Sequence, residues 1–167
     1  MQAEDLQSFA ARMILQAHPP EVDLRRAISS LYYGLFHRLT EASAGRFAAG
    51  GNALMSQVTR AHSHGVARKV CERYTKSSPP FAERLQPLND PLPDEQLRSV
   101  AAAFVRLQEA RHGADYDLSK PVTFDDALDL LTLAQAARDS FATIEHQAAT
   151  AIFLAAMLLD DRWTRNG

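Results

Sequence analysis

The segment from Ala110 to Asp117 reads ARHGADYD and places Arg111, His112 and Tyr116 among two aspartates. Packing of a protein core seldom requires this mixture of side chains. A guanidinium binds phosphate strongly, and a neighbouring imidazole can transfer a proton. One interpretation is therefore a polar site for a phosphate-bearing ligand. The other is a capped helix end, in which Arg111 complements the helix dipole, the aspartates shape the following turn and Tyr116 covers the core.

A second group of polar and aromatic residues lies in the helix that we predict over residues 21–44. Arg26, Ser29 or Ser30, Tyr33 and His37 recur at steps of three and four, which places them on one helix face. A leucine and isoleucine stripe forms the buried face, with members Leu24, Ile28, Leu31, Leu35 and Leu39. Tyrosine and histidine on the other face indicate either a half-buried cleft or dimer contact, or the edge of the core with a hydrogen-bonded histidine.

The remaining periodicity is helical throughout, and no convincing strand pattern occurs. We expect helices over residues 4–16, 54–74, 93–114 and 124–160, the last of them bent or broken on the way. The first would bury a face made of Leu6, Phe9, Ala10, Met13 and Leu15. Asp94 suits the start of the 93–114 helix, and residues 77–93 read mostly as loop. Thr123 and Asp126 have the spacing of a capping box.

The predicted fold is thus all-α, a single-domain up-and-down bundle of about five helices over residues 1–167. Residues 145–163 form a C-terminal helical extension of this bundle. Within it, Ala151, Leu154, Ala155 and Leu158 recur at helical spacing and predict a face for the core or for another subunit.

Composition narrows the classes of function. A formal net charge of −2 argues against a basic surface that coats nucleic acid without sequence preference. Cys71 is the only cysteine and is expected to be a buried packing residue. The acidic start lacks the pattern of a signal peptide, and the apolar run 148–159 is too short to span a bilayer. We therefore expect a cytoplasmic protein that does not associate with membranes.

Two histidines, His62 and His64, resemble a pair of metal ligands. Residues two apart on a helix point in different directions, so joint ligation would need a non-helical backbone. No second pair and no phosphate-binding glycine motif accompanies them. The sequence therefore predicts neither a metal nor a cofactor.

The two polar motifs together resemble those of the HEPN superfamily. In that superfamily an early helix has the form R-A-x-S-x-x-Y-Y-x-x-F-H, and a later helix ends in R-x-x-A-D-Y-D. Residues 26–37 read RAISSLYYGLFH and residues 111–117 read RHGADYD. The similarity extends from about Asp5 to Ile144, which is most of the chain.

This resemblance implies an up-and-down helical bundle that forms a homodimer. In the ribonuclease members, an R-x4-6-H motif from each subunit meets at the dimer cleft, where arginine holds the scissile phosphate and histidine helps to activate the ribose 2′-hydroxyl. Other members are not nucleases and bind nucleotides or accompany a minimal nucleotidyltransferase. The ligand-binding residues implied here are Arg111, Asp115, Tyr116, Arg26, Tyr33 and His37, and the catalytic candidates are Arg111 and His112.

Two registers compete for the nuclease motif. If Arg111 is the motif arginine, the position five residues later holds Tyr116, a poor general base at neutral pH because its ordinary pKa is about 10. If Arg106 is the motif arginine, His112 completes R-x5-H, but on a regular helix the two side chains diverge. A helix that ended just before His112, with Gly113 as its cap, would remove that objection. We favour Arg111.

Three classes of function follow. The first is a nucleotide- or RNA-binding accessory protein, paired with a nucleotidyltransferase in a toxin–antitoxin or defence system. The second is a metal-independent endoribonuclease toxin. The third is a structural module for protein interaction.

Overall fold

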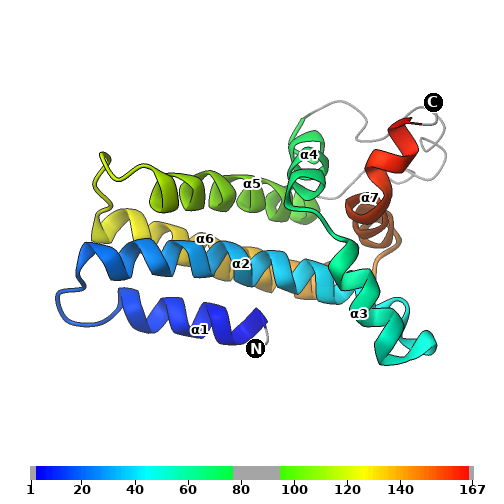
Figure 1. The fold of residues 1–167 in the computed structure, drawn as a ribbon, viewed down its shortest axis with the longest axis horizontal. Coiled ribbons are helices and arrows are strands. Elements are labelled where there is room, and N and C mark those ends of the chain that lie inside the picture. The colour runs from blue at the N-terminus through cyan, green and yellow to red at the C-terminus, as the bar shows by residue number, and fades with distance from the viewer. Residues whose placement is uncertain (1–2, 77–94, 166–167) are drawn as a thin grey trace. The chain divides into compact units, whose positions relative to one another are not determined.

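A computed structural model describes residues 3–76 and 95–165, with side chains as far as Asp160. Over these ranges the chain forms α-helices and one 3-10 turn, and no strand (Figure 1). The predicted all-α class is therefore confirmed, but the described ranges hold seven α-helices instead of about five. They are α1 (Ala3–Ile14), α2 (Glu21–Gly45), α3 (Gly51–Ala61), α4 (His64–Tyr74), α5 (Glu95–Tyr116), α6 (Phe124–Ile144) and α7 (Ala148–Arg165), with the 3-10 turn η1 (Ala48–Gly50) before α3.

The extra helices come from breaks in two of the predicted ones. The backbone is extended at His62 and Ser63, with ψ angles of 136° and 134°, and this divides the predicted 54–74 helix into α3 and α4. The predicted 124–160 helix divides into α6 and α7 at residues 145–147. Neither break contains glycine or proline, which are the residues that ordinarily signal a helix end in a sequence.

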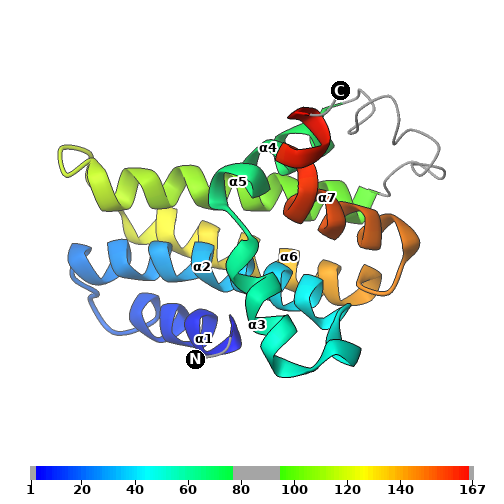
Figure 2. The same ribbon diagram turned by 45° about the vertical axis from the view of Figure 1, so that its right-hand side comes forward.

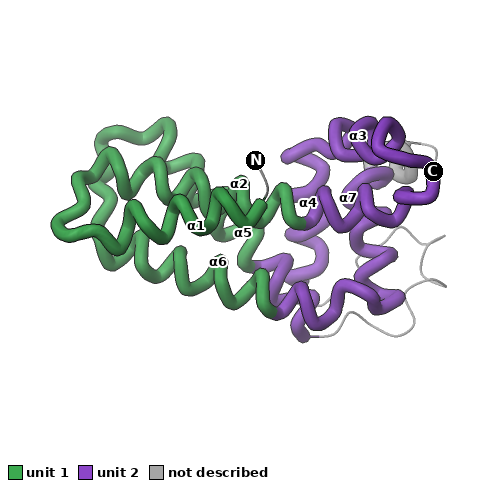
Figure 3. Tube along the Cα trace, turned by 90° about the horizontal axis from the view of Figure 1, so that it is seen from below, with its two compact units in different colours: residues 1–38, 103–139 green, residues 39–102, 140–167 purple. Residues whose placement is uncertain are grey.

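The chain divides into two compact units (Figure 3). Unit 1 comprises residues 1–38 and 103–139, and unit 2 comprises residues 39–102 and 140–167. The single domain over residues 1–167, with its extension over 145–163, stays a prediction. The predicted loop over 77–93 and the helix start at Asp94 lie outside the described residues.

In unit 1, α1 and the unit's parts of α2, α5 and α6 lie side by side (Figures 1 and 2). The predicted leucine and isoleucine stripe of α2 is confirmed, because its members are at most 4% exposed. The Tyr32 ring packs against Phe104 of α5 with 5.5 Å between centroids. On the polar face of α2, Arg26 is exposed, Tyr33 and His37 are half-buried and Ser29 is buried.

The buried face of α1 differs from the predicted one. Phe9 and Leu15 are 41% and 63% exposed, whereas Ala10 is buried as predicted, together with Ala3, Gln7 and Ile14. The reason lies in α2, where a Cβ atom on Gly34 would come within 3.4 Å of the Ala3 carbonyl oxygen. The glycine allows close approach of the two backbones, and this contact fixes which side of α1 faces α2.

In unit 2, α4 and α7 pack together. The rings of Tyr74 and Phe153 meet edge to face at 4.9 Å, and Arg73 pairs with the carboxylate of Asp160 at 2.5 Å. Cys71 is buried, as predicted, and burial raises the pKa of its thiol. The buried residues of α7 include Phe153, Leu154, Ala156 and Met157.

The predicted face of α7 is therefore only partly correct. Leu154 is buried, but Ala151, Ala155 and Leu158 are partly exposed. The buried face is centred on Phe153 and Met157, because the large aromatic ring fills the contact with Tyr74 on α4.

Within the described part of the chain, no single helix combines the length and the apolar character needed to cross a membrane. Among the described helices, α6 and α7 satisfy the length and hydropathy criteria only when they are taken together, and the chain bends sharply between them.

Candidate functional site

The last turns of α5 carry an ion pair between Arg111 and Asp115, both in unit 1. The Arg111 Nε donates a hydrogen bond of 2.8 Å to Asp115 Oδ2. The two side chains are only 20% and 23% exposed. Because the pair uses Nε alone, the two terminal nitrogens of the guanidinium take no part in it.

Aromatic rings surround this guanidinium. Its central carbon lies 5.2 Å from the Tyr33 ring centroid, 5.7 Å from that of Tyr32 and 5.9 Å from that of Tyr116. All three distances permit cation–π attraction. Burial by itself would lower the pKa of Arg111, but the electrostatic effects of Tyr33 and Asp115 outweigh it and the pKa is raised. Arg111 is thus a cation held in one place.

Asp115 also joins α5 to α2. The hydroxyl of Ser29 donates a short hydrogen bond to the second oxygen of this carboxylate. Ser30 instead donates to the Arg26 carbonyl oxygen of its own helix at 2.9 Å. Of the two serines left open by the sequence, Ser29 therefore belongs to the polar face shared with Arg111.

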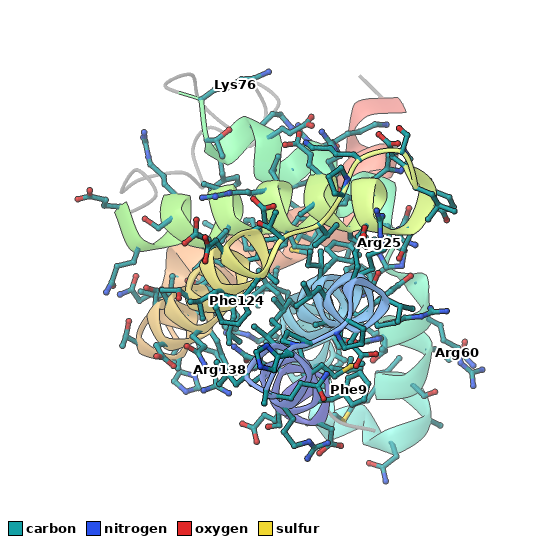
Figure 4. The ribbon with its side chains drawn as sticks, turned by 90° about the vertical axis from the view of Figure 1, so that its left-hand side faces the viewer. Phe9, Arg25, Arg60, Lys76, Phe124 and Arg138 are labelled. Atoms are coloured by element: carbon teal, nitrogen blue, oxygen red, sulfur yellow. The ribbon has the colours of Figure 1, made fainter. Side chains whose placement is uncertain are left out.

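Arg25 is a functional neighbour that the sequence reasoning missed. Its Nη1 donates to the carbonyl oxygens of Ala114 and Asp117 at 3.0 and 3.2 Å, and its Nη2 donates to that of Lys120 at 2.6 Å. Figure 4 shows Arg25 between α2 and the connection that follows α5. Arg25 therefore satisfies the carbonyl end of α5, a role that one sequence interpretation gave to Arg111. The signal in the sequence was an arginine in the first turns of α2 with a glutamate, Glu21, four residues before it.

A groove of about 400 Å³ opens on unit 1, lined by Asp115, Tyr33 and Tyr116, which contact Arg111, but Arg111 itself is not among its lining residues. We call it the arginine groove. Four of the predicted ligand-binding residues line it, and the complete lining is Val22, Arg25, Arg26, Ser29, Tyr33, Ala114, Asp115, Tyr116 and Leu118. The structure thus brings Arg26, Tyr33, Asp115 and Tyr116 together, although they come from two helices far apart in sequence.

Three of the predicted site residues, Arg111 and the candidate histidines His37 and His112, lie outside the lining of this groove. The His37 ring stacks on Tyr33 at 6.3 Å between centroids, one turn further along α2. His112 is exposed, and its ring centroid lies 5.0 Å from that of Tyr116. Each histidine therefore touches a ring of the groove without reaching into it.

The course of α5 distinguishes between the two possible registers of the nuclease motif. Helix α5 continues to Tyr116, so Gly113 lies inside it and does not cap it before His112. Arg106 and His112 are therefore on different faces of a regular helix. Arg106 lines a different groove from Tyr116. Tyr116 itself is 67% exposed, which overturns the interpretation that it covers the core.

Among the described residues, no group of three or more histidine, cysteine or acidic side chains is placed to hold a metal. His62 lies at the break between α3 and α4, where its Nδ1 is 2.9 Å from the Val58 carbonyl oxygen. Desolvation lowers the pKa of this imidazole despite that hydrogen bond. The backbone there is non-helical, as joint ligation would need, but His62 is engaged with its own helix.

Compared with models of protein families, with curated proteins and with solved structures, the chain has no match. The functional inference therefore depends on the geometry of the arginine groove.

Proposed function

We propose that the chain is a HEPN-like protein whose arginine groove binds the phosphate of a nucleotide or RNA. In this role it is a binding or accessory protein. The observation that carries the proposal is the placement of Arg111, a cation held by Asp115, Tyr33 and Tyr116, all three of which line an open groove. A surface arginine with a purely solvating role would not need three aromatic neighbours and a carboxylate to orient it.

The groove offers complementary groups for both parts of a nucleotide. Arg26 is exposed on its wall and can meet an incoming phosphate first. Arg111 supplies the terminal nitrogens that its ion pair with Asp115 leaves unused. The rings of Tyr33 and Tyr116 provide faces on which a base can stack.

The proposal includes a protein partner. Val22, Tyr116 and Leu118 line the same groove and are 61%, 67% and 78% exposed. Large apolar side chains gathered at a polar site favour contact with another chain. The HEPN resemblance implies two such chains, a second copy of this protein and a minimal nucleotidyltransferase within a toxin–antitoxin or defence system. A nucleotidyltransferase gene beside this one would support the second.

The proposed binding is tested with Arg111→Ala. We would measure the affinity for adenosine triphosphate and for a short single-stranded RNA at about 50 and 200 mM salt. We expect salt-sensitive binding and a loss of at least about tenfold in the variant. Arg12→Ala is the control, because Arg12 is an exposed arginine of α1 outside the groove. If the wild type and Arg111→Ala bound these ligands with equal affinity, the proposal that Arg111 contacts a phosphate would be wrong.

One observation favours a second candidate, an endoribonuclease. Arg111 and His112 both contact the Tyr116 ring, at 5.9 and 5.0 Å. His112 could then accept a proton from the ribose 2′-hydroxyl while Arg111 neutralises the phosphate. Cleavage of RNA to products with 2′,3′-cyclic phosphate ends, abolished by His112→Ala, would support it. Intact RNA together with no nucleotide binding would leave a module for protein interaction as the remaining class.

A further inference from the structure

Helix α1 carries its large apolar side chains on a face that unit 1 covers only in part. Leu6, Phe9 and Met13 recur at steps of three and four and therefore share one side of the helix. Phe9 is 41% exposed, and Leu6 and Met13 are half-buried. Helix α1 forms the edge of unit 1, with α2 beside it and no other described helix of the unit beyond it (Figures 1 and 4). This apolar side of α1 is thus open to another chain.

Two opposite charges border the apolar side along one flank. Asp5 and Arg12 are exposed and lie seven residues apart, each directly before a member of the apolar side. If Leu6 and Met13 are assigned to the a positions of a heptad and Phe9 to the d position, both charges fall on g positions. Charges at these positions determine which helices pair and in which orientation.

A second copy of α1 in antiparallel orientation fits this pattern of charge. A two-fold axis brings the same face of two identical helices together and can reverse the direction of one of them. With the axis near Ser8 and Phe9, midway between the charges, Asp5 of each copy lies opposite Arg12 of the other. A parallel pair would place the two g positions on opposite sides of the contact and leave these charges unpaired.

The pairing does not require a carboxylate without other contacts. Asp5 already takes part in an interaction within its own chain. A carboxylate has two oxygens and accepts hydrogen bonds from several donors, so Arg12 of a second copy can be one of them.

We propose that this face of α1, made of Leu6, Phe9 and Met13 with Asp5 and Arg12 at its border, is a contact between two copies of the chain with antiparallel helices. Phe9 lies nearest the axis and packs against the other copy. A contact of one short helix from each copy is small, so the association is weak and concentration-dependent. No residue of α1 lines the arginine groove, and the contact does not depend on the proposed function.

The first experiment follows the association of the full chain by sedimentation velocity over a wide range of protein concentration. Phe9→Glu should raise the dissociation constant of the dimer at least about tenfold, because it places a charge in the apolar centre of the contact. Phe124→Glu is the matched control, since Phe124 is a phenylalanine of unit 1 that is also 41% exposed but belongs to α6. It should associate like the wild type.

The second experiment tests the antiparallel orientation by exchanging charges. Asp5→Arg and Arg12→Glu each place like charges opposite one another, so each alone should weaken association about three- to tenfold at low salt. In an equal mixture of the two variants, every opposed pair again carries opposite charges. The mixture should therefore form mixed dimers about as tightly as the wild type. These exposed positions also keep the test valid if Phe9→Glu does not fold.

Three results would overturn the proposal. The first is a wild-type chain that stays monomeric at every concentration. The second is equal association of Phe9→Glu and Phe124→Glu, whether both are weakened or neither is. The third is a mixture of the two charge variants that associates no better than either variant alone, because the two helices would then not be antiparallel.

Discussion

A single guanidinium, that of Arg111, meets three tyrosine rings and one carboxylate within unit 1. Its position is secured indirectly as well, because Ser29 fixes the far side of the Asp115 carboxylate. A side chain with four rotatable bonds loses much entropy when it is held in one place. The neighbours of Arg111 stabilise one rotamer, and under the proposed function this would lower the entropy cost of binding a phosphate.

Ser29→Ala tests this positioning. We expect a loss of about 1 kcal/mol in the free energy of unfolding, because Asp115 loses a buried donor. We also expect weaker binding of adenosine triphosphate, because Arg111 is less well oriented. Urea denaturation and calorimetric titration measure the two effects. Ser30→Ala is the matched control: its hydroxyl bonds only within α2, and alanine favours the helix. Equal effects of the two substitutions would contradict the positioning role.

Four of the residues that the sequence grouped together line one groove, but the sequence did not indicate Arg25. Arg26, Tyr33, Asp115 and Tyr116 were found because their types are unusual at helical spacing, and the structure brings them to one groove. Arg25 pairs with Glu21 four residues earlier, a spacing visible in the sequence, but its contacts to the connection are made to backbone carbonyl oxygens, which leave no signature there. His37 and His112 were grouped with the site by spacing, which fixes a helix face but not the depth of a groove.

At the scale of elements, the connection between α5 and α6 is held by side chains of α2. Arg25 binds three carbonyl oxygens of this region, and Glu21 accepts the Val122 N–H at 3.2 Å. Asp117 accepts both the N–H and the hydroxyl of Ser119 within the turn, and this second bond holds the pKa of its carboxyl below the ordinary value. The arginine groove borders this connection, so the order of the connection affects the groove.

Arg25→Ala should therefore cost about 2 kcal/mol in the free energy of unfolding, because the carbonyl end of α5 loses a charged donor. Hydrogen exchange of the amides at residues 117–122 should accelerate more than that of α1. Arg26→Ala, a change at the exposed neighbouring arginine, should alter the free energy of unfolding by less than about 0.5 kcal/mol. If Arg25→Ala were equally mild, the bonds to the connection would contribute little.

The start of α6 confirms the predicted capping box. Asp126 Oδ2 accepts from the Thr123 hydroxyl at 2.6 Å, and the Asp126 N–H donates back to that hydroxyl oxygen at 3.1 Å. Thr123→Ala should lower the free energy of unfolding by about 1 kcal/mol. Thr132→Ala is the control, since Thr132 lies within α6 and bonds only to Leu128. Urea denaturation of the two variants gives the comparison, and equal losses would contradict a capping role.

Because of this cap, we expect the free energy of unfolding to depend on pH. The hydrogen bond from Thr123 lowers the pKa of Asp126 below its usual value of 3.8. A lowered pKa stabilises the folded state above the unfolded value, and this contribution disappears as the pH falls through the folded value. Asp126→Asn should thus be less stable than the wild type at pH 7 and equally stable near pH 2. A difference that persists unchanged at pH 2 would show that the carboxylate charge is not the cause.

Element boundaries were predictable where the chain carries a cap and unpredictable where it does not. The capping pair Thr123 and Asp126 marks the start of α6 in the sequence. Pro19 and Pro20 mark the start of α2, which follows them directly. The breaks after α3 and α6 have no such residues, and only tertiary packing decides that α7 turns its Phe153 side onto α4. Helical periodicity continues across the break at His62 and Ser63, which explains why one helix was predicted over residues 54–74 where two occur. The break after α6 agrees with the expectation that the 124–160 helix is bent or broken.

At the scale of the whole molecule, three helices contribute residues to both units. Residues 21–38 of α2 belong to unit 1 and residues 39–45 to unit 2, and α5 and α6 are divided in the same way. A helix propagates cooperatively along its length, so melting in one part destabilises the next turn. We therefore predict that the two units unfold together as a single domain.

Phe153→Ala tests this prediction from within unit 2. Phe153 is completely buried against Tyr74, so its removal should cost about 3–5 kcal/mol. If the chain is one cooperative domain, the slowest-exchanging amides of α1 in unit 1 and of α4 in unit 2 lose the same free energy of protection. Phe47→Ala, at a residue of unit 2 that is 42% exposed, should change neither set appreciably. Faster exchange confined to α4 would instead mean that the units unfold separately, and the continuity of α2, α5 and α6 would then not transmit stability between them.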